Sequence, residues 1–190
     1  MLTDLIIFDI DDTLFRTTTK VKLMIGDRCI KSLSAAEYNV YTLKNSEKYD
    51  FSEFRSADHF YKTATPIPAV MDLAKKIILK GMHKTRVILV SARADMDDKE
   101  LFLNTFHKHG LNINRAYIHR AGNLKPMITN LAKAKIITDE INAGSYQNIR
   151  MFDDAVTNLN TFLDLRTKFP KIKFYAYLVL PNGSIKKYIK

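Results

Sequence analysis

The sequence predicts an α/β fold with three α/β/α layers, a mostly parallel five-stranded sheet and one small insertion. Short apolar runs typical of buried strands alternate with segments of helical periodicity, which indicates right-handed crossovers and a parallel sheet. Polar residues directly follow three of the expected strands. The 190 residues, with 46% hydrophobic and 26% charged residues, suit a single domain spanning 1–190 with a substantial core.

The first expected strand is the apolar run at residues 5–8, which leads directly into Asp9, Asp11 and Asp12. Such a run is typical of a strand buried on both faces, and open α/β sheets bind ligands where their strands end. Residues two apart in an extended chain point to the same side, so Asp9 and Asp11 should face one point. Neighbouring carboxylates repel unless they share a cation or a proton. The pattern predicts a metal site, an acid/base site, or both.

Residues 16–65 contain no long amphipathic helix and are expected to form a small cap or flap over the end of the first strand. Residues 20–25 and 28–33 have the pattern of two short strands joined by a Gly-Asp turn. Ser34 and Glu37 have the spacing of a capping box at the start of a short helix. The aromatic residues of this insertion should pack it onto the core.

The rest of the chain supplies four helices and four strands. Helices are expected at residues 69–79, 97–109 and 127–141, the first ending at Gly81, and a fourth contains Leu159, Phe162, Leu163 and Leu165. Strands are expected at 86–90, 116–119, 149–152 and 173–180. Ser91 follows the strand at 86–90, and Asp153 and Asp154 follow the strand at 149–152. Because parallel strands end at one edge of a sheet, these residues should meet the acids that follow residue 8 on one rim.

The charge balance is unusual: 30 Lys and Arg stand against 20 Asp and Glu, a formal net charge of +10. A basic surface attracts polyanions, so nucleic acid or a phosphorylated metabolite is a natural partner, although an inert solvated surface is the alternative. The lone cysteine, Cys29, excludes an internal disulfide and suits a reducing compartment. No apolar run has the length of a membrane span, so we expect a cytoplasmic protein with no membrane partner.

Together these residues resemble the motifs of the haloacid dehalogenase (HAD)-like phosphohydrolases, in their phosphatase branch. The run Asp9-Ile10-Asp11-Asp12-Thr13 is similar to the family's first motif, Asp-x-Asp-x-Thr after an apolar strand. Ser91 resembles the second motif, and Asp153-Asp154 with Asn158 resembles the acidic fourth motif. The resemblance covers the chain from residue 4 to about 177 and implies a Rossmann-like fold.

The family's third motif is a lysine, for which Lys125, Lys133 and Lys135 compete. On a helical wheel Lys133 falls between Ile136 and Ile137, on the side that should meet the sheet, whereas Lys135 projects to solvent. Lys125, which precedes a proline, resembles a form of the motif seen in parts of the family. We favour Lys133 and keep Lys125 as the alternative.

The resemblance assigns a role to each motif. Asp9 would attack phosphorus and form an aspartyl-phosphate, and Asp11 would serve as general acid and then general base. Mg²⁺ would be held by the Asp9 carboxylate, the Asp11 backbone carbonyl and Asp154. Lys133 would neutralise the transferring phosphoryl group, and Ser91 with nearby backbone amides would orient it.

Other residues would bind substrate or support the site. Ser91, Ala92, Arg93 and Lys125 are candidate substrate contacts, and Asp153, Asn158 and Thr13 are candidate supporting residues. Several alternatives stay open. Asp11 or Asp12 could cap a turn, Ser91 could cap a helix, and Arg93 could form a surface salt bridge. The sequence leaves open whether Asp153 or Asp154 would bind the metal.

The implied activity is Mg²⁺-dependent hydrolysis of a phosphate monoester, since the family's dehalogenases lack the acid/base two residues after the nucleophile. Three features favour a nucleotide or a nucleic-acid end as substrate. They are the small insertion, the basic surface, and a Ser-Ala-Arg sequence similar to the second motif of polynucleotide 3′-phosphatase domains. A phosphorylated metabolite, a phosphoprotein, or a non-catalytic phosphate- or nucleic-acid-binding module on the same fold are the alternatives.

Overall fold

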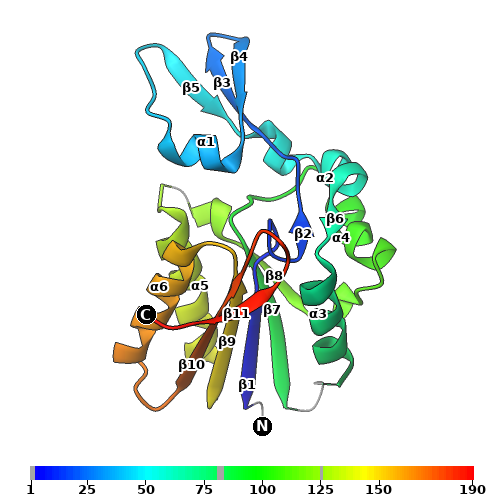
Figure 1. The fold of residues 1–190 in the computed structure, drawn as a ribbon, viewed down its shortest axis with the longest axis vertical. Helices are drawn as coiled ribbons and strands as arrows, with labels where there is room; N and C mark the ends of the chain where they lie inside the picture. The colour runs from blue at the N-terminus through cyan, green and yellow to red at the C-terminus, as the bar shows by residue number, and fades with distance from the viewer. Residues whose placement is uncertain (1–2, 81–83, 125) are drawn as a thin grey trace.

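The computed structural model describes residues 3–80, 84–124 and 126–190, and is built around a six-stranded sheet in the order β11-β10-β9-β1-β7-β8 (Figure 1). Five strands are parallel: β1 (Asp4–Phe8), β7 (Thr85–Ser91), β8 (Tyr117–Arg120), β9 (Asn148–Asp153) and β10 (Lys173–Val179). These are the five strands expected from the sequence. The mostly parallel α/β sheet is therefore confirmed.

The sixth strand corrects the five-stranded prediction. β11 (Ile185–Tyr188) pairs antiparallel with β10 at one edge of the sheet. It has no apolar run or alternation that would mark it as a strand, and it forms because a tight turn folds the chain back onto β10. Gly183 occupies the left-handed region of that turn at φ +83°, and the backbone N–H of Leu180 donates to the Ser184 carbonyl at 2.9 Å.

Helices cover the sheet on two sides and make the three layers. α3 (Pro68–Lys80) and α4 (Lys99–Lys108) pack on one face, and α5 (Thr129–Ala143) and α6 (Val156–Asp164) pack on the other. α2 (Ala57–Thr63), which belongs to the insertion, packs against α4. Alternate residues of β1 serve the two sides: Ile6 and Phe8 join the first core, and Leu5 and Ile7 the second. Gly81, the expected end of the helix at 69–79, lies outside the described residues.

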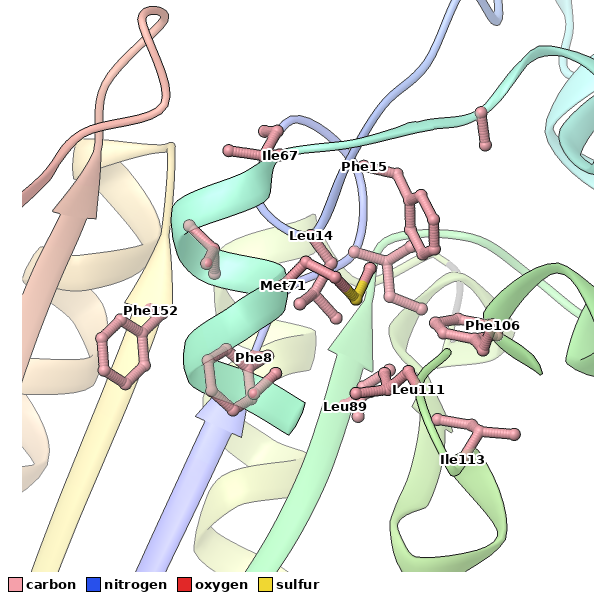
Figure 2. Close-up of a cluster of buried hydrophobic side chains, with 14 of the residues drawn as sticks. Phe8, Leu14, Phe15, Ile67, Met71, Leu89, Phe106, Leu111, Ile113 and Phe152 are labelled. Carbon is pink, nitrogen blue, oxygen red and sulfur yellow. The ribbon is translucent and has the colours of Figure 1, made fainter. Parts of the chain in front are cut away.

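The core between α3 and the sheet fixes the loop that leaves β1. Met71 of α3 lies beside Phe8 and Leu14, while Phe15 points toward Phe106 (Figure 2). The Phe15 and Phe106 rings meet edge-on at 5.3 Å between centroids. Burial of each such side chain contributes about 1.5–3 kcal/mol. The acidic residues 9, 11 and 12 therefore lie between buried apolar residues, Phe8 before them and Leu14 and Phe15 after them.

The residues between β2 (Phe15–Arg16) and β6 (Thr65–Pro66) form a small subdomain above the carboxyl ends of the core strands (Figure 1). It contains an antiparallel sheet of β3 (Val21–Ile25), β4 (Arg28–Leu33) and β5 (Glu47–Asp50), with α1 (Ala35–Val40) and η1 (Ser52–Arg55). α1 begins at the predicted capping box of Ser34 and Glu37. Three further 3₁₀ turns occur: η2 (Ile113–Arg115), η3 (Ala121–Leu124) and η4 (Leu165–Thr167). Among the described residues no helix has the length and apolar character needed to cross a bilayer.

Candidate active site

Asp9 and Lys133 form the centre of the site. Asp9 follows the last residue of β1, is 4% exposed, and its backbone N–H donates to the Phe152 carbonyl at 3.0 Å. Lys133, on the sheet-facing side of α5 as the helical wheel predicts, is 2% exposed. Its ammonium donates to Asp9 Oδ1 at 2.6 Å and to Asp153 Oδ2 at 2.8 Å. One buried cation therefore joins the ends of β1 and β9.

The charges of this cluster shift each other's pKa values. Burial raises the pKa of Asp9 well above its ordinary value; Lys133 opposes this shift, and the carboxylates of Asp153, Asp154 and Asp11 add to it. For Lys133, burial alone would lower the pKa, but Asp153 and Asp9 outweigh it and raise the pKa above its ordinary value. Lys133 therefore stays charged, and the acidic cluster is short of positive charge.

Asp153, the last residue of β9, and Asp154, which follows it, have different surroundings. Asp153 is fully buried, and its Oδ1 accepts hydrogen bonds from the Asn158 amide and the Ala155 N–H, both at 2.9 Å. With Lys133 on Oδ2, both of its oxygens are engaged. Asp154 is exposed, and its Oδ1 accepts a long bond of 3.4 Å from the Thr13 hydroxyl. Asp154 thus has more free acceptor capacity than Asp153.

Asp9, Asp153 and Asp154 each present a carboxylate oxygen, and these oxygens lie within 4.8 Å of one another. The donor set is hard and all-oxygen, as Mg²⁺ prefers. Asp154 is exposed as a residue, but the protein around its carboxyl group removes part of the water that would stabilise the charged form. This desolvation and the charge of Asp153 raise the pKa of Asp154 to about 7, against the weaker influence of Lys133, so the cluster holds repelling charge that a bound cation would relieve. The residues therefore fit a divalent cation with Asp9 and Asp154 as its free donors.

Asp11 lies beside this cluster and is held by Arg93. The chain turns tightly after β1, with Asp12 in the left-handed region at φ 55°, so Asp9 and Asp11 do not continue one extended strand. Arg93 donates from Nε to Asp11 Oδ2 at 2.9 Å and from Nη2 to Oδ1 at 2.6 Å, and the Thr17 hydroxyl adds a bond to Oδ1 at 3.0 Å. The Asp11 carboxylate is therefore fixed by two side chains.

Arg93 is itself buried, at 1% exposure, and reaches the insertion as well as the site. Its Nη1 donates to the Phe54 carbonyl at 3.0 Å, and its Nη2 donates to the Thr19 hydroxyl at 3.0 Å. The guanidinium also lies over the Phe60 ring, 4.8 Å from its centroid. Arg93 therefore ties Asp11 to two points of the inserted segment and is not exposed on the surface.

β7 ends at Ser91, and the loop that follows begins with Ala92. Ser91 is fully buried, its Oγ accepts the Arg93 N–H at 3.1 Å, and Ala92 is exposed beside it. Gly122 of η3 packs against this loop so closely that an added Cβ would lie 2.5 Å from the Ala92 carbonyl oxygen. Only glycine fits there, and the Gly122 N–H donates to the Arg93 carbonyl at 3.2 Å.

Sequence reasoning located most of this site but missed three supports. Thr17, Thr19 and Gly122 carry no motif, and their contacts exist only because the insertion and η3 fold against the loops. Lys135 points away from the site and pairs with Asp139 at 2.8 Å, as expected for the solvent side of α5. Lys125, the alternative lysine, lies outside the described residues.

Comparisons with known proteins agree with this architecture. The sequence matches no family model and no curated protein. Among solved structures, the chain is similar to the HAD domain of the effector protein Lem4 from Legionella pneumophila, with a TM-score of 0.56 over 95% of this chain and 88% of that one. The fold is HAD-like. Sequence identity to that domain is 9%, so the similarity supports the fold alone. Any chemical activity has to be argued from the residues of the site.

Proposed function

We propose that this HAD-like protein is a Mg²⁺-dependent phosphatase that hydrolyses a phosphate monoester through an aspartyl-phosphate. The observation that carries the proposal is the Asp9–Lys133–Asp153 cluster at the strand ends, with Asp154 beside it. It combines a buried carboxylate nucleophile, a fixed cation to receive phosphoryl charge, and oxygen donors for a metal. The HAD-like fold is consistent with this chemistry.

The nucleophilic step uses the free oxygen of Asp9. Lys133 occupies Oδ1, so Oδ2 is the atom available to attack phosphorus, form the P–O bond and displace the alcohol oxygen. Lys133 stays within reach of the phosphoryl oxygens as their charge builds up. The metal, held by Asp9, Asp154 and the Asp11 backbone carbonyl, would neutralise the remaining phosphoryl charge.

Asp11 handles the protons in this scheme. Both Asp11 oxygens accept from Arg93 in the substrate-free protein, so Asp11 has to leave this pairing and take up a proton before it can give one to the departing alcohol oxygen. It then takes a proton from the water that attacks the aspartyl-phosphate, which restores Asp9 and releases phosphate. Arg93 and Thr17 fix the direction of the Asp11 carboxylate, so we assign Arg93 to positioning as well as to its predicted place near the substrate. Ser91 and the backbone amides of its loop, including that of Ala92, would orient the phosphate.

A nucleotide or a nucleic-acid end is the substrate that we favour. The net charge of +10 favours encounter with polyanions, and the subdomain between β2 and β6 is small. The Ser-Ala-Arg sequence that resembles polynucleotide 3′-phosphatase domains begins at the last residue of β7, and its arginine contacts Asp11.

The test is phosphate release from a generic aryl phosphate and from a panel of 3′- and 5′-phosphorylated oligonucleotides and mononucleotides. Release should require Mg²⁺ and fall at least about a thousandfold in Asp9→Asn. Asp139→Asn, an exposed change on α5, is the matched control and should retain activity. Absence of any Mg²⁺- and Asp9-dependent release would contradict the proposal and leave a non-catalytic binding module as the better interpretation.

A further inference from the structure

One face of the sheet is covered over only half of its width. α3 and α4 pack over β1, β7 and β8, whereas α5 and α6 lie on the opposite side. Figure 1 shows β9, β10 and β11 with no helix in front of them. Among the described residues this half of the face is thus open, and it forms one wall of a groove of about 590 Å³ against α3.

A row of aromatic rings runs from the covered half of this side of the sheet, where Phe8 and Phe152 are buried, to its open half. Phe8, Phe152 and Tyr177 occupy matching positions on β1, β9 and β10 and stack at 4.9 and 4.7 Å, with interplanar angles of 16° and 11°. In Figure 2, Phe152 lies beside α3, where the covered part of the face ends. The row ends at the partly exposed Tyr177, and Tyr175, two residues earlier on the same face, lies under the Arg150 guanidinium at 5.3 Å.

Cations surround these rings. Lys187 is directly opposite Tyr177 in the β10–β11 register and shares its face, as does Lys173 by alternation along β10. Lys76 and Lys80 of α3 line the other wall of the groove and are exposed. The acid in the lining is Asp4, and Arg150 already neutralises it at 2.7 Å. Residues 165–190 contain seven Lys and Arg and no Asp or Glu.

We infer that this open face binds single-stranded nucleic acid. Partly exposed tyrosines among lysines and arginines are what a single strand requires, because its phosphates need cations and its bases need flat apolar surfaces. A second copy of the chain is a poorer occupant, since like charges would face each other.

The turn after β10 contacts the residue before α3: a Cβ added at Gly183 would lie 3.0 Å from Ile67, and Arg16 donates to the Pro181 carbonyl at 2.9 Å. These contacts separate the groove from the catalytic rim, so binding here does not require the proposed chemistry.

The test measures binding of a fluorescein-labelled, unphosphorylated oligothymidylate to the full chain by fluorescence anisotropy at several salt concentrations. Lys173→Glu with Lys187→Glu should weaken binding more than tenfold, and the salt slope should fall by about 0.7 for each lysine that neutralises a phosphate. The matched control is Lys135→Glu with Lys186→Glu, one on the solvent side of α5 and one on the other face of β11, which changes the net charge equally away from the open face and should change affinity less than threefold. Tyr175→Leu should cost roughly tenfold through lost stacking.

Three results would overturn the inference. They are no binding of oligothymidylate at low salt, equal losses in the two lysine pairs, and inorganic polyphosphate binding as tightly as the oligonucleotide. A shift from dimer to monomer in sedimentation for the Lys173/Lys187 variant, with oligonucleotide binding unchanged, would assign the face to self-association instead. Unchanged thermal unfolding and aryl phosphatase activity in both pairs show that the folds are intact. Because the probe carries no phosphate monoester, failure of the phosphatase proposal would leave this measurement valid.

Discussion

Arg93 and Asp11 form a two-point ion pair that joins the loops after β7 and β1, with Nη2–Oδ1 and Nε–Oδ2 distances of 2.6 and 2.9 Å. The same guanidinium donates to the Phe54 carbonyl in the insertion. The candidate acid/base therefore shares one rigid group with the subdomain that covers the strand ends. Disorder in that subdomain would release the Asp11 carboxylate as well.

Removal of Arg93 should be costly. Arg93→Ala leaves the Asp11 carboxylate and the Phe54 carbonyl without their buried donor, so we expect the free energy of unfolding to fall by about 3–5 kcal/mol. Urea unfolding followed by circular dichroism measures this change. Arg55→Ala, a change of the same type at an exposed position, should stay within about 0.5 kcal/mol of the parent. Equal effects of the two substitutions would show that the ion pair does not stabilise the fold.

Lys133 should stabilise the protein as well as contribute to catalysis. Lys133→Met leaves two buried carboxylates, those of Asp9 and Asp153, without their shared cation, and we expect a loss of about 3–5 kcal/mol in unfolding free energy. Lys135→Met on the solvent side of α5 should cost less than about 0.5 kcal/mol. Thermal and urea unfolding of the two variants compare these losses. A loss of stability in Lys133→Met as small as that in Lys135→Met would contradict a stabilising role for the ion pairs of Lys133 with Asp9 and Asp153.

Metal removal should have a measurable effect if Asp154 is a ligand. Addition of Mg²⁺ should raise the unfolding temperature, and chelation should reverse the rise, because a ligand that binds only the folded state stabilises it. In Asp154→Asn the Mg²⁺ concentration that produces a given rise in unfolding temperature should increase at least about tenfold. Asp139→Asn should respond as the parent does. A rise that persists unchanged in Asp154→Asn would place the ion elsewhere.

Two histidines away from the site should make the fold sensitive to acid. Burial lowers the pKa of His109, with help from Lys108 and Lys75, and burial also lowers the pKa of His119 despite the opposing effect of Glu140. Below pH about 6.5 these two histidines bind protons in the unfolded chain but remain neutral in the folded chain. These two histidines should therefore lower the stability as the pH drops from 7.5 to 5.5, whereas the raised pKa values of Asp9 and Asp154 act the other way over the same range. His109→Gln with His119→Gln should make the slope of unfolding free energy against pH less positive, and an unchanged slope would show that these histidines do not contribute to it.

Much of the site could be predicted because its residues follow local rules. Asp9, Ser91 and Asp153 were located by strand ends alone, since parallel strands share one edge. Lys133 was located by helical periodicity, which separates it from Lys135 two residues away. Each of these patterns lies within a single helix or strand, so it can be recognised in the sequence without knowledge of the tertiary structure.

The features that were missed depend on contacts between distant segments. The burial of Arg93 requires Thr19 and Phe54 from the insertion, whose placement no periodicity encodes. Gly122 has no unusual backbone angle to mark it; its necessity comes from the loop packed against it. β11 forms a strand because it pairs with β10, and the pattern of its own four residues does not predict a strand.

β11 also has a consequence for how the protein behaves at high concentration. As an edge strand it exposes backbone N–H and C=O groups that could pair with another chain and extend the sheet between molecules. Lys186 and Lys187 are successive residues on it, one on each face of the sheet, and Lys190 follows shortly after. Two copies that met edge to edge along β11 would bring these lysines together, so intermolecular strand pairing along this edge is opposed by charge repulsion. The strand that completes the sheet thereby also guards its edge against aggregation.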